Sequence, residues 1–262
     1  MRVWIGTSGW QYADWRAAFY PPSVPQGEWL EHYAAGFRTV ELNNSFYRLP
    51  PRARFEQWAR RTPEDFVVAV KASRYLSHMK RLRDPDEPVG RLMDNAAGLG
   101  AKLGPVLVQL PPRFRVDAAR LAAALEAFPE QTRVAVEPRD PTWFCEPVRA
   151  VLAERNAALC LADRDEVWAT PRWRTADWGY ARFHTGHDAP RPCYRAATLH
   201  TRARELARMW PGDEPVFVFF NNDPRCCAVR DAVAFARACG EHGLACTRVP
   251  VDEVTPAAGE RP

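Results

Sequence analysis

Short apolar runs rich in β-branched and aromatic residues recur along the chain, with polar stretches between them. Near-continuous apolar runs are typical of parallel strands that are buried on both faces of a sheet. The runs therefore predict eight strands, at residues 3–7, 39–43, 66–71, 106–110, 133–137, 158–163, 180–184 and 216–221.

Between these runs, apolar residues recur at spacings of three and four, which indicates amphipathic helices. Asp117 suits an N-cap and Pro51 suits a helix start. The predicted helices are 28–36, 52–61, 90–103, 117–128, 147–155, 195–210 and 228–241. The connection 164–178 is weakly helical and is expected to be irregular, and 244–249 is expected to form a short strand or a closing loop.

The alternation of eight strands with helices predicts a single closed (β/α)8 TIM-type barrel with long loops on its C-terminal face. The chain has 262 residues, and barrels of this kind commonly have about 250. We expect the barrel to span 1–252 and a disordered tail to occupy 253–262. An open doubly wound sheet is the alternative, although Gly6-Thr7-Ser8-Gly9 lacks the GxGxxG spacing of a dinucleotide site.

Charge and cysteine usage narrow the class of protein. The formal net charge is +4, which is too small to indicate a nucleic-acid partner and which suits a small anionic ligand. The seven cysteines include no CxxC pair, so we expect reduced thiols and no zinc site. No signal peptide is recognised and no apolar run is long enough to cross a bilayer. We therefore expect a cytoplasmic protein without a membrane partner, whose oligomeric state the sequence does not define.

Ionisable and amide side chains gather where the predicted strands end, and in a (β/α)8 barrel this face carries the active site. Residues two apart in a strand project to the same side of the sheet. Pairs with this spacing are Glu41 with Asn43, Glu137 with Arg139, and Arg182 with His184. Buried charges cost free energy unless they are paired. The cluster therefore predicts a functional pocket, with ion pairs that merely close the barrel end as the alternative.

The candidate residues follow from this cluster. Carboxylates and an imidazole suit general acid/base chemistry, and a lysine suits stabilisation of negative charge or a Schiff base. The predicted catalytic residues are Glu41, Lys71, Glu137, Asp163 and His184. The predicted substrate-binding residues are Tyr12, Asn43, Tyr47, Arg74, Gln109, Arg139, Arg182, Asn221 and Asn222.

Two loops after the strands add further candidates. Residues 8–27 are rich in aromatic side chains, so they are expected either to cap a ligand or to cover the core. Residues 72–88 carry Arg74, His78 and Lys80 with two further arginines. A basic loop of this kind suits phosphate or carboxylate groups, with a merely solvated loop as the alternative.

At these residues the chain resembles the domain of unknown function 72 family, also called YecE-like. The matching motifs span nearly the whole chain in order: Ile5-Gly6-Thr7-Ser8-Gly9-Trp10, Val40-Glu41-Leu42-Asn43, Ser45-Phe46-Tyr47-Arg48-Leu49-Pro50, Val70-Lys71-Ala72-Ser73-Arg74, Gln109-Leu110-Pro111-Pro112, Arg182-Phe183-His184 and Phe220-Asn221-Asn222-Asp223. The resemblance implies a TIM-type barrel and no settled activity. The chain departs from the family pattern at Pro138-Arg139-Asp140-Pro141 and at Pro224-Arg225-Cys226-Cys227, where relatives tend to carry arginine-histidine and glycine respectively.

The function that these residues favour is an enzyme that acts on a small, oxygen-rich, anionic molecule by acid/base chemistry at the barrel mouth. Its phosphate or carboxylate would bind to arginines, and the reaction could be that of a hydrolase, a lyase or an isomerase. A divalent-metal sugar isomerase or epimerase is a second hypothesis. Its Mn²⁺ or Mg²⁺ ligands would be Glu137, Asp163, His184 and Asp223.

Two hypotheses come from other classes of protein. The basic and aromatic loops could offer charge and stacking to a single-stranded nucleic acid, although no binding motif is present. A non-catalytic ligand sensor would use the same pocket without chemistry. Intact phenotypes in Glu41→Gln and Lys71→Met variants that still bind a ligand would favour the sensor.

Overall fold

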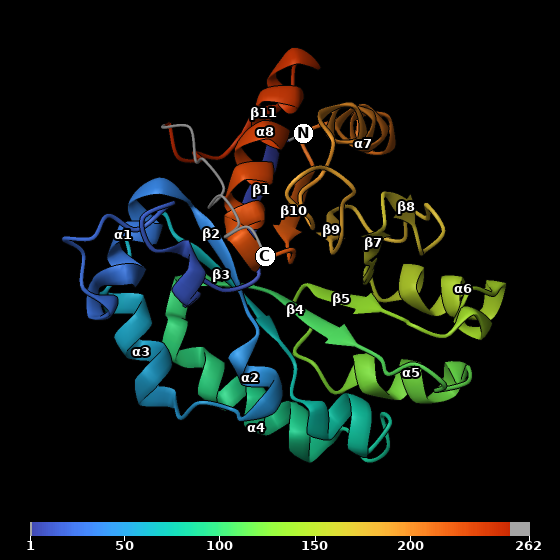
Figure 1. Cartoon of the computed structure of the whole chain (residues 1–262). Coiled ribbons are helices and arrows are strands. Elements are labelled where there is room, and N and C mark those ends of the chain that lie inside the picture. The colour runs from blue at the N-terminus through green and yellow to red at the C-terminus, as the bar shows by residue number, and fades with distance from the viewer. Residues whose placement is uncertain (1, 252–262) are drawn as a thin grey trace. The chain divides into compact units, whose positions relative to one another are not determined.

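The computed structural model of this chain describes residues 2–251, so the predicted tail at 253–262 lies outside the described residues. The described residues form two compact units (Figure 1). Unit 1 comprises those within Met1–Val40, Ala162–Ala169 and Ala181–Pro262, and unit 2 comprises Glu41–Leu161 and Thr170–Tyr180. The single domain expected for 1–252 stays a prediction.

Most of the first sheet belongs to unit 1, and its strand order is β11-β1-β10-β9-β7-β8. The strands are β1 (Arg2–Thr7), β7 (Leu161–Arg164), β8 (Val167–Trp168), β9 (Gly179–Phe183), β10 (Pro215–Phe220) and β11 (Ala245–Cys246). β1 pairs in parallel with β10 and with β11, whereas β7 and β8 form an antiparallel pair. The short β11 lies within the segment 244–249, where a strand or a closing loop was expected.

The second sheet has the order β2-β3-β4-β5-β6, so its neighbours in space are also neighbours in sequence. Its strands are β2 (Thr39–Leu42), β3 (Val67–Lys71), β4 (Leu103–Gln109), β5 (Val134–Glu137) and β6 (Ala158–Leu159). β3 to β6 are parallel, and the register of β4 and β5 places Gln109 opposite Glu137. The carboxyl ends of these strands therefore meet at one edge of the sheet.

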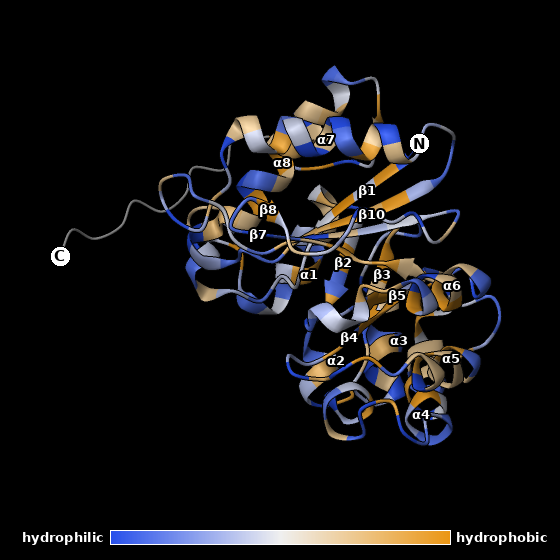
Figure 2. Cartoon of the chain, turned by 90° about the vertical axis from the view of Figure 1, so that its right-hand side faces the viewer, coloured by the Kyte–Doolittle hydropathy of each residue, from blue (hydrophilic) through white to orange (hydrophobic). Residues whose placement is uncertain are grey.

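Helices connect the strands of each unit, and Figure 2 shows that hydrophobic stretches lie on strands and helices while the loops are mostly hydrophilic. The α-helices are α1 (Trp29–Gly36), α2 (Asn44–Tyr47), α3 (Arg52–Arg60), α4 (Asp86–Ala96), α5 (Ala118–Glu126), α6 (Glu146–Glu154), α7 (Ala196–Met209) and α8 (Cys227–Glu241). A π-helical segment, η3, spans Tyr75–Met79. The 3-10 segments are η1 (Ala13–Trp15), η2 (Gln26–Glu28), η4 (Ala97–Lys102), η5 (Pro141–Trp143) and η6 (Pro224–Cys226).

The predicted elements are confirmed with shifts at their ends. Asp117 is the N-cap of α5, and its side chain accepts a hydrogen bond from the Arg120 N–H at 3.0 Å. The strand predicted at 158–163 is interrupted at Cys160, and its two parts pair in different sheets as β6 and β7. The connection after it contains β8 and no α-helix, as its weak periodicity indicated.

The expectation that all cysteines are reduced is wrong for one pair. Cys193 and Cys227 form a disulfide across a Cα–Cα distance of 4.8 Å, and both residues are fully buried. The fold of unit 1 brings the loop after β9 against the start of α8. A sequence separation of 34 residues gives no spacing signal for such a contact.

The structure has no helix, among its described residues, that is both long enough and apolar enough to span a membrane.

Candidate functional site

Four polar side chains lie at the carboxyl ends of consecutive strands in unit 2. Glu41 is in β2, and Lys71, Gln109 and Glu137 are the last residues of β3, β4 and β5. Both glutamates are fully buried, and Lys71 is 8% exposed. Parallel pairing of β3, β4 and β5 puts Lys71, Gln109 and Glu137 at one edge of the sheet. Their role in a functional site stays a prediction.

Glu137 is held from two sides. The Gln109 side-chain amide donates a hydrogen bond to Glu137 Oε2 at 2.8 Å, and Arg139 Nε lies 3.8 Å from Glu137 Oε1. Gln109 is almost fully buried, whereas the Arg139 side chain is 31% exposed. The carboxylate is therefore fixed inside the sheet edge, while Arg139 extends from it toward solvent.

Glu41 has a separate partner in the same unit. The Tyr180 hydroxyl donates a hydrogen bond to Glu41 Oε2 at 2.6 Å, and both side chains are fully buried. A neutral donor stabilises the carboxylate without cancelling its charge. The two glutamates are thus oriented by different groups, Glu41 by a phenol and Glu137 by an amide and a guanidinium.

The lysine is positioned by α2. The Ser45 hydroxyl donates to the backbone oxygen of Lys71 at 2.7 Å, which ties the start of this short helix to the end of β3. The Lys71 ammonium lies 4.3 Å from the centre of the Phe46 ring. A cation over an aromatic face keeps its charge with little water around it.

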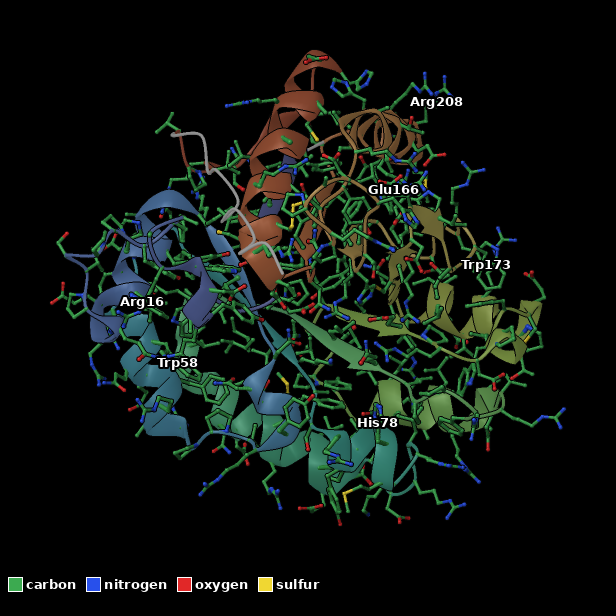
Figure 3. The ribbon with its side chains drawn as sticks, viewed as in Figure 1. Arg16, Trp58, His78, Glu166, Trp173 and Arg208 are labelled. Carbon is green, nitrogen blue, oxygen red and sulfur yellow. A yellow bond between two sulfur atoms is a disulfide. The ribbon has the colours of Figure 1, made fainter. Side chains whose placement is uncertain are left out.

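His78, in η3, is a half-buried histidine whose pKa is lowered by burial and by nearby positive charges. Its ring meets the Phe46 ring edge to face at 4.9 Å, and its Nδ1 lies 2.9 Å from the Ser77 hydroxyl. Burial and the positive charges of Lys71, Arg139 and Arg74 lower the pKa of His78 to about 4. His78 is therefore neutral at pH 7. Its position is labelled in Figure 3. π-Helical segments are rare and occur frequently at functional sites.

Other predicted residues of unit 2 lie on the segments around this cluster. Arg74 is the N-cap of η3 and is exposed. Tyr47 ends α2 and is 74% exposed, and its ring packs edge to face on Phe46 at 5.1 Å. Asn43 is the N-cap of the same helix.

Unit 1 contains a second group of predicted residues, on β9 and after β10. Arg182 Nη2 donates to Asn221 Oδ1 at 3.2 Å, and the Asn221 side-chain nitrogen lies 3.2 Å from His184 Nδ1. Arg182 and His184 thus project to the same side of β9, as their spacing of two indicated. Asn221 links them.

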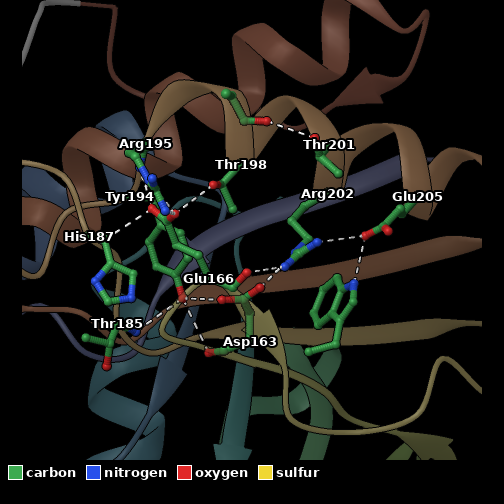
Figure 4. A network of polar contacts seen from close by, with 12 residues as sticks. Asp163, Glu166, Thr185, His187, Tyr194, Arg195, Thr198, Thr201, Arg202 and Glu205 are labelled. Carbon is green, nitrogen blue, oxygen red and sulfur yellow. Dashed lines mark hydrogen bonds and ion pairs between the residues drawn. The ribbon is translucent and has the colours of Figure 1, made fainter.

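Asp163 is part of a polar network that fastens α7 to β7 (Figure 4). Its carboxylate accepts hydrogen bonds from the Tyr194 hydroxyl at 2.8 Å and from Arg202 Nε at 2.7 Å. Burial raises the pKa of Asp163, and the bonds from Arg202 and Tyr194 oppose that change. Both carboxylate oxygens are therefore engaged by side chains of the same unit, an arrangement typical of a structural ion pair.

Asn222 contacts a buried carboxylate that the sequence did not single out. Its side-chain amide donates to Asp231 Oδ2 at 2.7 Å and to the Pro192 carbonyl at 3.0 Å. Burial raises the pKa of Asp231 to about 7, against the hydrogen bonds from Tyr194 and Asn222. Asn222 thus has a structural position between α8 and the loop after β9.

The aromatic loop 8–27 covers the core of unit 1. Trp15 and Tyr20 are fully buried, and Tyr20 stacks on Trp29 at 4.4 Å. The Tyr12 hydroxyl donates to the Ser8 carbonyl at 2.5 Å, and its ring packs on Trp15. Of the two expectations for this loop, the covering role is the one that its burial supports.

The set proposed for a divalent metal is spread over both units, with Glu137 in unit 2 and the other three residues in unit 1. Within residues 2–251, no group of three or more His, Cys, Asp or Glu side chains is arranged to hold a metal ion. The described donors therefore do not form a ready ligand set for Mn²⁺ or Mg²⁺.

Sequence reasoning missed three residues of the unit 2 cluster. Tyr180 precedes Arg182 by two positions, so the same alternation rule that paired Arg182 with His184 could have found it. His78 was named only as part of a basic loop, and Phe46 only within a motif. Their roles depend on the packing of α2 against η3, which no local pattern encodes.

The fold and the cluster define a class: a mixed α/β protein with parallel sheets whose strands end in buried polar residues. The chain belongs to the family described as protein of unknown function DUF72, whose family model matches residues 4–256. The sequence resemblance to this family is thereby confirmed.

Relatives of this family have been found in several bacteria. The UPF0759 protein YunF of Bacillus subtilis is 30% identical over 153 residues, which are 55% of this chain and 53% of that protein. The UPF0759 protein YecE of Escherichia coli K12 is 28% identical over 145 residues, 55% of this chain and 51% of that protein. The chain thus spans about half the length of the curated relatives it matches.

Crystal structures of two family members have similar folds. A DUF72 protein of Thermotoga maritima superimposes with a TM-score of 0.80 at 27% identity, over 90% of this chain and 98% of that one. One from Enterococcus faecalis gives a TM-score of 0.74 at 19% identity, over 91% of this chain and 98% of that one.

Proposed function

We propose that the unit 2 cluster is the site of an enzyme that acts on a small, oxygen-rich, anionic molecule by acid/base chemistry. One observation carries the proposal. Lys71 and His78 both contact the Phe46 ring, and Arg139 lies beside Glu137. Burial and the charges of Lys71, Arg139 and Arg74 lower the pKa of His78. Three cations around a single neutral group form a region of positive potential that attracts a phosphate or a carboxylate.

The other residues of the cluster supply the acid/base part of the proposal. Glu137 and Glu41 are buried carboxylates with fixed orientations, held by Gln109 and Tyr180 respectively. A carboxylate in such a position can take or return a proton on a bound ligand. Lys71 is placed to stabilise negative charge that develops during the reaction. Hydrolase, lyase and isomerase chemistry all remain within this proposal.

The closed (β/α)8 barrel remains the proposed architecture. Its support is the strand order: β2 to β6 follow one another in one sheet, and β7, β9, β10 and β1 follow one another in the other. A closed barrel requires this sequence-consecutive order. A cytoplasmic location also remains part of the proposal. Disulfides persist mainly in oxidising compartments, so the Cys193–Cys227 bond is an observation that this location does not explain.

The test is a thermal-shift screen of phosphorylated and carboxylated metabolites against the wild type, Arg139→Ala and Lys71→Met. A matched control is Arg149→Ala, since Arg149 is an exposed arginine of α6 in the same unit. We expect anionic hits that lose their stabilising effect in the first two variants and keep it in the control. Hits that are equally strong in all four proteins would refute the site. If the wild type and Glu41→Gln both bind the ligand and neither converts it, the result would favour a non-catalytic ligand sensor.

A further inference from the structure

Large apolar side chains are exposed at few positions, and in unit 2 they gather on one set of loops. Within residues 2–251 they are Tyr47, Met79, Val116, Val167 and Val251. The three that belong to unit 2 are 74%, 66% and 38% exposed, and they follow β2, β3 and β4 in turn. Single exposed apolar residues are ordinary, whereas a group at one sheet edge marks a surface that is used for binding.

Two of these residues belong to the segments that form the cationic cluster. The Tyr47 ring packs on Phe46, whose ring also contacts Lys71 and His78. Met79 follows His78 directly in η3. The ring contacts place the exposed Tyr47 phenol beside Lys71 and His78, and Met79 adds an exposed thioether on the same segment as His78. We call Tyr47 and Met79 the apolar rim of the site.

The third exposed apolar residue of unit 2, Val116, follows β4. Its N–H donates to the Thr142 hydroxyl at 3.0 Å, and that hydroxyl donates to Asp140, the residue after Arg139. The backbone of Val116 therefore lies beside the segment that follows Arg139.

We propose that the ligand of this site carries an aromatic ring beside its anionic group, and that Tyr47 and Met79 pack against the ring while Lys71, Arg74 and Arg139 bind the anion. This inference rests on the proposed function and narrows its substrate class to aryl or heteroaryl phosphates and carboxylates. Tyrosine favours offset or edge contacts with a second ring, and methionine sulfur makes favourable contacts with ring edges. A plain sugar phosphate would leave both side chains exposed.

The experiment compares pairs of anions that differ in the ring alone. Dissociation constants of phenyl phosphate and methyl phosphate, and of benzoate and acetate, are measured by calorimetry at one ionic strength. The proteins are the wild type, the Tyr47→Ala/Met79→Ala double variant and the control Val167→Ala, which alters an exposed apolar residue of unit 1 that is 64% exposed. Phenol serves as a ring without an anion.

We expect the aryl anion to bind the wild type and the control at least about tenfold more tightly than its alkyl partner, a difference of about 1.4 kcal/mol. The double variant should lose this preference and keep its affinity for the alkyl anion. Whichever pair shows the preference identifies phosphate or carboxylate as the anionic group.

Four outcomes would overturn the inference. Equal binding of aryl and alkyl anions by the wild type would refute the ring contact and leave the anion site standing. A preference that survives in the double variant would place the ring elsewhere. Phenol binding as tight as that of phenyl phosphate would make the apolar rim an independent surface. Binding of none of the anions would refute the proposed function together with the inference.

Discussion

Among single residues, His78 shows how neighbouring charges define a side chain's chemistry. The imidazole is neutral at pH 7 because burial and three cations disfavour its protonated form. A neutral imidazole can both donate and accept a hydrogen bond. Near the proposed anion site, this makes His78 a group that can exchange a proton with a bound ligand.

The first prediction concerns the titration of this histidine. In ¹³C-histidine NMR spectra, the His78 signal should titrate with a midpoint near pH 4, and Arg139→Ala or Lys71→Met should raise that midpoint toward 6.5 by removing a positive charge. Since the folded-state pKa lies below the ordinary value, the stability that His78 contributes should be lost as the pH falls from 6.5 through about 4. A wild-type midpoint near 6.5 would contradict the prediction. A midpoint in Arg149→Ala that rises as much as in Arg139→Ala and Lys71→Met would contradict it too.

The second prediction concerns Asp231, a buried carboxyl in α8. Burial raises its pKa from 3.8 to about 7, so the folded chain binds this proton more tightly than the unfolded chain. The stability of the wild type should therefore fall as the pH rises from 3.8 to 7, at up to about 1.4 kcal/mol for each pH unit. Asp231→Asn should show a flatter dependence in urea unfolding measured from pH 5 to pH 8.

The matched control for this experiment is Asp94→Asn, an exposed aspartate of α4. Its unfolding profile should follow that of the wild type across the same pH range. A wild-type stability that rises between pH 5 and 7, with the same rise in Asp231→Asn, would show that Asp231 ionises without cost.

Among the elements, α7 is attached to its sheet by one buried ion pair. Arg202 Nε lies 2.7 Å from Asp163 Oδ2, and Arg202 Nη1 lies 3.1 Å from Glu205 Oε2. Glu166 accepts hydrogen bonds from the backbone and side chain of Arg195 at the start of the helix. Burial raises the pKa of Glu166, but the bonds from Arg195, His187 and Thr198 outweigh it and hold the pKa at about 2.

The third prediction tests whether Asp163 is structural. Arg202→Met should lower the free energy of unfolding by about 3 to 5 kcal/mol, because it leaves a buried carboxylate without its cation. Arg202→Met combined with Asp163→Asn should recover part of that loss, and Arg208→Met, at an exposed position of the same helix, should have little effect. A loss below about 1 kcal/mol in Arg202→Met would show that Asp163 does not depend on this pair.

Element positions were predictable where a local pattern determines them. The strands ending at Lys71, Gln109 and Glu137 follow from their apolar runs, and Asp117 follows from capping preferences. The predicted start at Gly90 is four residues later than the observed start of α4 at Asp86, and Pro88 lies within the first turn. Proline is tolerated in the first turn, where its missing N–H has no partner to lose.

For the candidate site, the sequence predicts the positions of the polar residues but not their partners. The polar residues at strand ends can be located from the sequence, because each one directly follows a run of apolar residues. The partners of those residues come from elsewhere in the chain: Tyr180 for Glu41, and Arg202 with Tyr194 for Asp163. Such pairs join residues of different sheets, helices and loops, so no local sequence pattern identifies them.

At the scale of the molecule, residues 2–251 contain one covalent link besides the backbone, the Cys193–Cys227 disulfide. The fourth prediction is that Cys193 and Cys227 are joined in purified protein, so unreduced digests should contain their linked peptides, and thiol titration of the denatured, unreduced chain should find five free thiols. Cys227→Ser should lower the free energy of unfolding by about 2 to 4 kcal/mol, because the bond restricts the unfolded chain. Cys145→Ser, which removes a free thiol, is the control, and dithiothreitol should abolish the difference. Seven titratable thiols would contradict the link.

The neighbourhood of this bond also carries a departure from the family pattern. Arg225 and Cys226 both have positive φ angles, 60° and 61°, a region that glycine occupies at no steric cost. This chain therefore holds two residues other than glycine in a conformation that disfavours side chains. The Arg225 N–H donates to Asp14 at 2.6 Å, which helps to stabilise the turn.

The Cys193–Cys227 bond encloses a ring of the main chain that contains all of α7 and β10. The exposed turn at Pro211–Gly212 lies inside that ring. A protease that nicks this turn would therefore leave both fragments on one molecule, and they would separate on a gel after reduction alone. A single band on a non-reducing gel therefore does not show that the backbone is intact.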